Sequence, residues 1–191
     1  MRKWESAGAG APCQDRRMST SRTELLRWQA DLTWSLFTYH LDRLEPGDFL
    51  REPAAVCWTV HEDADGRWWP DWAEGEPDPV PVPTIAWLTW HIGWWWTTAV
   101  ADVRGTEPPG RTEIAWPGEG AAAVAWLREL REEWTAVLDG LDDAALDRPS
   151  AYPWDAEAGL TVGHTAAWVN AELMKNAAEI GQLRLRYAAE R

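Results

Sequence analysis

The chain has 191 residues and a net charge of −13, and 46% of its residues are hydrophobic and 26% charged. This is the composition of one folded domain with a buried core. The strong negative charge argues against nucleic acid or an anionic membrane as a partner. Two cysteines imply no disulfide framework. The sequence shows neither an apolar run of membrane-spanning length nor a hydrophobic signal region, so we expect a cytoplasmic protein.

The amino-terminal residues 1–17 differ from the rest of the chain. They are polar and rich in Gly and Ala, and Met18 directly precedes a helix-start signal. We therefore expect a disordered extension over residues 1–17 and a single domain over residues 18–191.

The first helix is predicted from Ser21 to about Leu44. Ser21 and Glu24 have the spacing of a capping box, and Pro46-Gly47 ends the helical pattern. One face of this helix contains Leu25, Leu32, Leu36, Tyr39 and Arg43, and Gln29, Thr33 and His40 lie beside it.

Residues 47–83 form an unusually long connection for a compact bundle, which suggests a functional insertion. Within it, residues 56–61 and 67–69 flank the turn sequence Asp63-Ala64-Asp65-Gly66. This pattern predicts a β-hairpin. Alternating prolines over residues 77–83 predict a stiff, extended exit.

Three further long helices follow, predicted at about 84–104, 120–138 and 161–189, with one short turn over 142–146. Four long helices without a repeat predict an all-α fold. We expect a four-helix up-down bundle whose long connection between the first and second helices carries a small β-hairpin.

Polar residues on the apolar faces point to a site, because bundle sites are built from inward side chains. On the fourth helix, Asn176 lies at the centre of the apolar stripe, with Glu172 and Glu179 beside it. His91 lies on an apolar face of the second helix. If both faces point inward, one nitrogen and two or three oxygens converge, which suits Zn, Mn or Ni.

The same side chains have a second interpretation, because His91, Asn176 and the two Glu could simply hydrogen-bond one another in the core. Two ionised carboxylates side by side favour a cation. His40 of the first helix either lines this site or only packs there. His61, His164 and Lys175 are expected at the surface or rim.

Tryptophan is concentrated near His91, since five of the chain's 17 Trp lie within residues 87–96. An aromatic-lined cavity suits an apolar or cationic small molecule. The Trp of the hairpin region either roof such a pocket or pack the insertion onto the bundle; they are Trp58, Trp68, Trp69 and Trp72. The predicted pocket wall contains Trp87, Trp94, Trp95 and Trp168.

Three segments, residues 85–94, 168–173 and 178–184, resemble the DinB-like superfamily of metal-binding four-helix bundles, and the resemblance covers about residues 21–189. It implies that His91 is a metal ligand and that the fourth helix supplies two more, four residues apart. Glu172 fits one of these places, but Asn176 stands where the family has His. In the alternative register, Lys175 and Glu179 occupy the places of two His. A divalent metal is therefore implied only if Asn176 or Glu179 replaces the missing His.

The superfamily includes thiol transferases and isomerases that use mycothiol or bacillithiol. The resemblance thus implies metal-dependent transfer of a low-molecular-weight thiol to a small-molecule substrate, as a fold-level analogy. Two alternatives stay open. One is a metal-free module that binds a small molecule in a Trp-lined cavity, and the other is a non-catalytic stress protein that forms a homodimer through a helix face.

Overall fold

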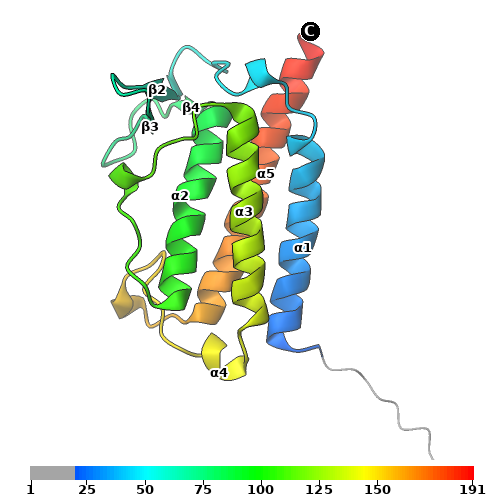
Figure 1. Ribbon diagram of the computed structural model, residues 1–191, viewed down its shortest axis with the longest axis vertical. Helices are drawn as coiled ribbons and strands as arrows, with labels where there is room; N and C mark the ends of the chain where they lie inside the picture. The colour runs from blue at the N-terminus through cyan, green and yellow to red at the C-terminus, as the bar shows by residue number, and fades with distance from the viewer. Residues whose placement is uncertain (1–19) are drawn as a thin grey trace, which may run out of the picture.

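The computed structural model describes residues 20–191, which contain four long helices. These helices pack side by side (Figure 1). Each was predicted, and the mainly helical fold class is confirmed; only the first helix ends earlier than expected. The predicted extension, residues 1–17, lies outside the described residues. The helices are α1 (Arg22–Leu41), α2 (Ile85–Arg104), α3 (Gly120–Asp139), the short α4 (Asp143–Leu146) and α5 (Val162–Ala189).

The helix directions differ from the predicted up-down order. In Figure 1, α1 and α5 both run upward, whereas α2 and α3 both run downward. Side-chain contacts agree, because Asn170 bonds Leu26 near the start of both α1 and α5, and Arg184 bonds His40 near their ends. The connection 105–119 is long enough to return along a helix of about 30 Å. This connection therefore lets α2 and α3 run parallel to each other, while α2 and α5 run antiparallel.

Local signals fix the ends of the helices. At the start of α1, Ser21 and Glu24 form the predicted capping box. At the start of α2, the Thr84 hydroxyl accepts from the backbone N–H of Trp87 at 3.2 Å. Gly105 ends α2 in the left-handed region at φ 70°, which glycine adopts at little cost.

The connection between α1 and α2 carries two small sheets. β2 (Val60–Glu62) and β3 (Trp68–Pro70) pair antiparallel, which confirms the predicted hairpin. β1 (Cys57–Trp58) pairs in parallel with β4 (Val82–Pro83). This second pairing was not predicted, because it joins residues far apart in the sequence. The remaining elements within residues 20–191 are three short 3₁₀ helices, η1 (Pro46–Asp48), η2 (Arg111–Glu113) and η3 (Ala156–Ala158).

Indole rings fill much of the core around α2. Trp90, Trp95 and Trp96 of α2 are at most 2% exposed, as is Trp134 of α3. Gly93 allows α3 to approach, since a Cβ added there would lie 1.8 Å from the Trp126 ring. The α2–α3 packing therefore requires glycine at this position or a shifted indole.

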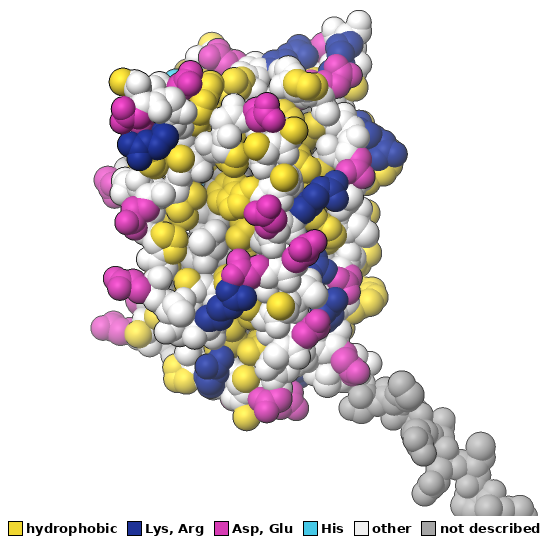
Figure 2. All heavy atoms as spheres, in the orientation of Figure 1, with side chains coloured by type: hydrophobic (Ala, Val, Ile, Leu, Met, Phe, Trp, Pro, Cys, Tyr) yellow, Lys and Arg dark blue, Asp and Glu magenta, His cyan; other side chains and the backbone are white. Residues whose placement is uncertain are grey.

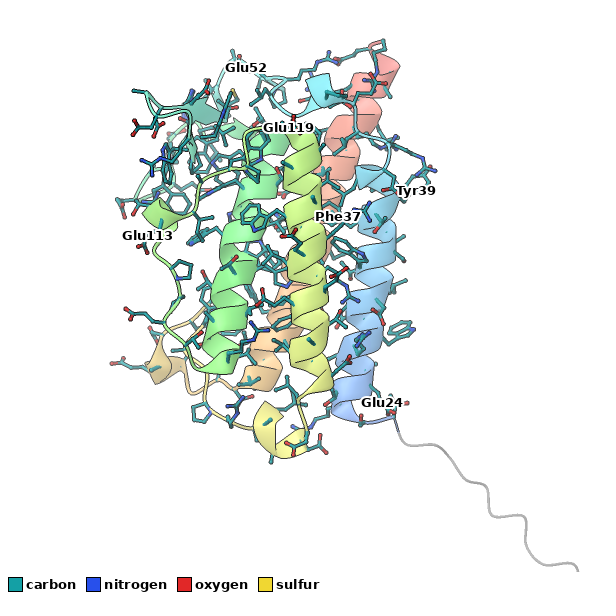
Figure 3. All side chains as sticks on the ribbon, viewed as in Figure 1. Glu24, Phe37, Tyr39, Glu52, Glu113 and Glu119 are labelled. Carbon is teal, nitrogen blue, oxygen red and sulfur yellow. The ribbon has the colours of Figure 1, made fainter. Side chains whose placement is uncertain are left out.

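The face of α1 that contains Leu25 and Leu32 points to solvent, and a different face packs into the core. Phe37 points into the bundle and Tyr39 points away from it (Figure 3). Contacts on both sides of α1 fix this rotation, because Arg131 pairs with Asp31 on the α3 side and Asn170 bonds Leu26 on the α5 side. The buried face consists of Ala30, Thr33, Phe37 and Leu41, and the exposed face includes Leu25, Leu32, Leu36 and Tyr39.

The surface over α3 mixes acidic with basic side chains on the face shown in Figure 2. Within residues 20–191, none of the helices combines the length and apolarity that a bilayer crossing requires.

Candidate functional site

The four predicted ligand residues lie where α2 packs against α5. His91 projects from α2, and Glu172, Asn176 and Glu179 project from successive turns of α5. Nε2 of His91 lies 3.7 Å from Oε1 of Glu172, and the two side chains are 19% and 18% exposed. We call these four residues the α2/α5 site. His91 and Glu172 lie close together, as expected. That they bind a metal stays a prediction.

Asn176 is fully buried, and both ends of its amide are engaged. Its Oδ1 accepts from the indole N–H of Trp95 at 3.1 Å, and its Nδ2 donates to Oε2 of Glu179 at 2.8 Å. The amide is thus held between an indole on α2 and a carboxylate on its own helix. Its oxygen already has a protein donor, which places Asn176 in the hydrogen-bonding role that the sequence offered as its second interpretation.

Lys175 is the residue that sequence reasoning left out of the site. Its side chain is 55% exposed, but its Nζ lies 2.9 Å from Oε1 of Glu172 and 3.9 Å from Oε1 of Glu179. The ammonium therefore sits between the two carboxylates. The signal was present in the sequence, because residues three and four apart on a helix are neighbours.

Two neighbouring groups hold Glu172 in its charged form. The His91 ring and the Lys175 ammonium lower the pKa of Glu172 to about 2, against the opposing effect of burial. At 3.7 Å the imidazole is beyond hydrogen-bond distance, whereas the Lys175 contact at 2.9 Å is a direct hydrogen bond. Burial, together with the Glu172 charge, raises the pKa of Tyr152.

Aromatic rings flank His91 as predicted. The imidazole stacks on Trp87 at a centroid distance of 4.9 Å, and the Trp94 ring lies tilted at a centroid distance of 5.9 Å. Trp58 of the insertion stacks on Trp87 at a centroid distance of 5.0 Å. Trp72 meets Trp94 edge-on at 5.2 Å. The insertion thus packs its indoles onto those beside His91.

Trp95 and Trp168 form a second aromatic pair deeper along the same helix contact. Their rings meet edge-on at 5.4 Å, and Tyr152 meets Trp168 at the same distance. His40 lies elsewhere, at the α1–α5 contact, where its Nδ1 accepts from Arg184. Burial lowers the pKa of His40, so this ring favours its neutral form there. His40 is consequently separate from the α2/α5 site.

Two other histidines occupy the surface positions expected from the sequence. His61 on β2 is exposed and lies 2.9 Å from Asp71. His164 is exposed in the first turn of α5, where its ring bonds the Thr161 hydroxyl at 2.9 Å. Neither belongs to the α2/α5 site.

The residues present do not fit the metal centre that the family resemblance implies. Such a site needs three or more protein donors. Among residues 20–191, no three His, Cys, Asp or Glu side chains lie close enough to hold a metal ion. The Asn176 amide is already bonded at both ends, and the Lys175 ammonium already neutralises Glu172. Only His91 and Glu172 remain as a converging pair of donors.

An apolar pocket of about 450 Å³ adjoins the α2/α5 site on the side of the insertion. It opens between β4, the start of α2 and the second half of α5. Glu179 reaches it with a side chain that is 38% exposed. We call it the Leu88 pocket; its lining consists of Val82, Pro83, Leu88, Ala178, Glu179, Gln182 and Leu183.

The comparisons with known proteins address the family and the fold. No curated protein matches the chain. The crystal structure of a conserved protein from Enterococcus faecalis is similar, with a TM-score of 0.60 and 11% sequence identity. The match covers 87% of this chain and 96% of that one, and at this identity it shows a shared fold. A family model for the DinB superfamily matches residues 29–180, which include all four residues of the α2/α5 site, and the chain therefore belongs to the DinB superfamily.

Proposed function

We propose that this chain is a small-molecule binding protein that works without a metal, and that its ligand lies in the Leu88 pocket against Glu179. The observation that carries the proposal is the position of Lys175. Its ammonium lies between Glu172 and Glu179 and provides the positive charge that two close carboxylates need. The chain therefore neutralises its own acidic pair.

The Leu88 pocket suits the apolar body of a small molecule. Its volume of about 450 Å³ is within the usual range of ligand pockets. Leu88 and Leu183 face it from two different helices, and Pro83 closes it from the insertion. Covering these side chains removes apolar surface from water, which is the main source of affinity for an apolar ligand.

Glu179 provides the polar contact for such a ligand. One carboxylate oxygen accepts from Asn176 at 2.8 Å, which fixes the orientation of the group. The other lies 3.9 Å from Lys175, beyond hydrogen-bond distance, and can accept from a ligand. An apolar molecule that carries an ammonium or another hydrogen-bond donor matches this arrangement.

Matched probes test this assignment by titration calorimetry. Cyclohexylmethylamine should bind more tightly than cyclohexylmethanol, because only the amine offers a charged donor to Glu179. Glu179→Gln should lower the affinity for the amine about tenfold, which corresponds to about 1.4 kcal/mol. The same variant should leave the affinity for the alcohol nearly unchanged. Glu157→Gln on the exposed η3 is the control. Ala178→Phe should fill the pocket and abolish binding of both probes; unaltered binding in that variant would overturn the proposal.

Metal analysis separates this proposal from the metal-dependent thiol transfer that the family resemblance implies. Protein purified without a His tag should hold less than about a tenth of an equivalent of Zn, Ni or Mn. About one equivalent, lost in His91→Ala and kept in His164→Ala, would overturn the metal-free proposal. It would establish the metal-dependent alternative instead.

A further inference from the structure

A row of large apolar side chains runs along the solvent face of α1. Their exposures range from 41% for Leu32 to 61% for Trp28. Apolar patches of several hundred Å² on a folded domain usually mark a site of interaction. We call this row the α1 stripe; it consists of Leu25, Trp28, Leu32, Leu36 and Tyr39.

The spacing of the α1 stripe is symmetric about Leu32. The intervals between successive residues are three, four, four and three, so reversing the direction of the helix leaves the pattern unchanged. A two-fold symmetric interface requires one patch that is complementary to itself. If two copies of α1 pack antiparallel about Leu32, this residue meets its own copy, Leu25 meets Tyr39, and Trp28 meets Leu36.

The two ends of the stripe also have complementary shapes. At the Leu25 end, an apolar pocket of about 350 Å³ lies between α1, α4 and α5. At the other end Tyr39 is 52% exposed, and the Arg43 guanidinium lies 3.9 Å from its ring centre. In the antiparallel arrangement Tyr39 of the partner subunit lies at the Leu25 end, where this pocket can receive it.

Charge favours the antiparallel direction over the parallel one. The stripe itself contains no charged residue, and Arg43 lies at one end. The other end carries Glu24 and Arg22, and the Arg22 guanidinium already pairs with Asp143 and Asp147. Antiparallel packing places Arg43 of one copy near Glu24 of the other, whereas parallel packing would bring the two Arg43 side chains together. The acidic net charge of −13 disfavours an anionic membrane as the occupant.

The exposed apolar area on α1 and α5 is also large enough for an interface with a second copy of this chain. Met174 and Leu185 are 37% and 53% exposed, and they flank Gly181 and Arg184 along α5, which both lie against His40 of α1. With the stripe they offer on the order of 600 Å² per subunit. Adding the polar rim brings this close to the ~800 Å² per partner of a standard interface. We propose that the α1 stripe is the interface of a two-fold symmetric homodimer with antiparallel α1 helices and Leu32 on the axis.

Sedimentation analysis of the full chain tests the dimer, independently of any ligand. The wild-type protein should sediment with twice the 21.6 kDa chain mass. Leu32→Glu and Leu32→Lys should each sediment as monomers, because like charges meet on the axis. An equimolar mixture of the two variants should restore the dimer. Val80→Glu, at a residue that is 57% exposed but outside the stripe, is the control and should remain dimeric.

Disulfide trapping tests the register without disturbing the fold by charge. In a chain with both native cysteines replaced by Ser, Leu32→Cys should form a linked dimer on oxidation, because only residues on the axis meet their own copies. Leu36→Cys, one turn away, should not. A wild-type protein that stays monomeric at about 100 µM, or equal trapping at both positions, would overturn the proposal.

Discussion

The indole N–H of Trp95 donates to the side-chain oxygen of Asn176 at 3.1 Å, and both residues are at most 2% exposed. This bond links α2 to α5 one helical turn after His91 along α2. The Trp95 N–H occupies the oxygen of the buried Asn176 amide. The nitrogen of the same amide donates to Glu179 and holds that carboxylate in place. The polar residue at the centre of the α5 stripe therefore joins two helices rather than offering its oxygen to a ligand.

Asn176→Leu should destabilise the fold by about 1–3 kcal/mol, because the Trp95 N–H is then buried without an acceptor. Urea denaturation followed by circular dichroism measures this loss. Adding Trp95→Phe removes the unpaired donor, so the double variant should recover part of the lost stability. A double variant whose loss equals the sum of the two single losses would show that the bond contributes nothing.

Asn176→His combined with Lys175→Ala should create a zinc site with three protein donors, His91, Glu172 and the new imidazole. The first change adds an imidazole to His91 and Glu172, and the second removes the ammonium that competes for Glu172. Zinc titration by calorimetry measures the gain. Adding His91→Ala to this double variant should remove binding, and adding His164→Ala should not. If the double variant takes up no zinc, the side chains do not converge as described.

Glu172 should stabilise the fold only above a definite pH range. Its pKa is about 2 in the folded chain against an ordinary 4.5, so its contribution is present above pH 4.5 and is lost as the pH falls towards 2. Glu172→Gln should therefore be less stable than wild type by about 1–3 kcal/mol at neutral pH. This difference in unfolding free energy should shrink steadily below pH 4.5. Glu157→Gln should show no such dependence.

Gly93→Ala should destabilise the bundle by about 1–3 kcal/mol, because the new methyl group overlaps the Trp126 ring. Thermal or urea unfolding measures the loss. Trp126→Leu in the same chain should relieve the overlap and recover part of it. Gly47→Ala is a matched control, since no atom lies within 4 Å of the added carbon; equal losses at both glycines would contradict the packing argument.

The elements of this fold could be predicted from local patterns. The capping box at Ser21, the glycine at 105 and the turn at Gly66 act over a few residues, and each occurs where the sequence indicates. The same holds for His91 and Glu172, which lie on apolar helix faces and meet when those faces pack. The β1–β4 pairing was missed, because parallel pairing between distant residues leaves no local pattern.

Amphipathic periodicity by itself could not decide how the helices are oriented. The apolar face containing Leu25 and Leu32 is exposed, because contacts of Asp31 with α3 and of Leu26 with α5 fix the rotation of α1. The parallel direction of α2 and α3 is set by where the connection 105–119 runs. Neither feature depends on residues next to each other in the chain.

The sequence by itself determined which segments are helical and which residues can carry chemistry, because capping, periodicity and residue type are local properties. Only the tertiary structure decided that Lys175 neutralises Glu172, that Trp95 engages Asn176, and that within residues 20–191 the α1 stripe faces away from the core. These outcomes depend on how far each helix rotates and slides against its neighbours. Packing of the whole bundle fixes those quantities, and no single segment encodes them.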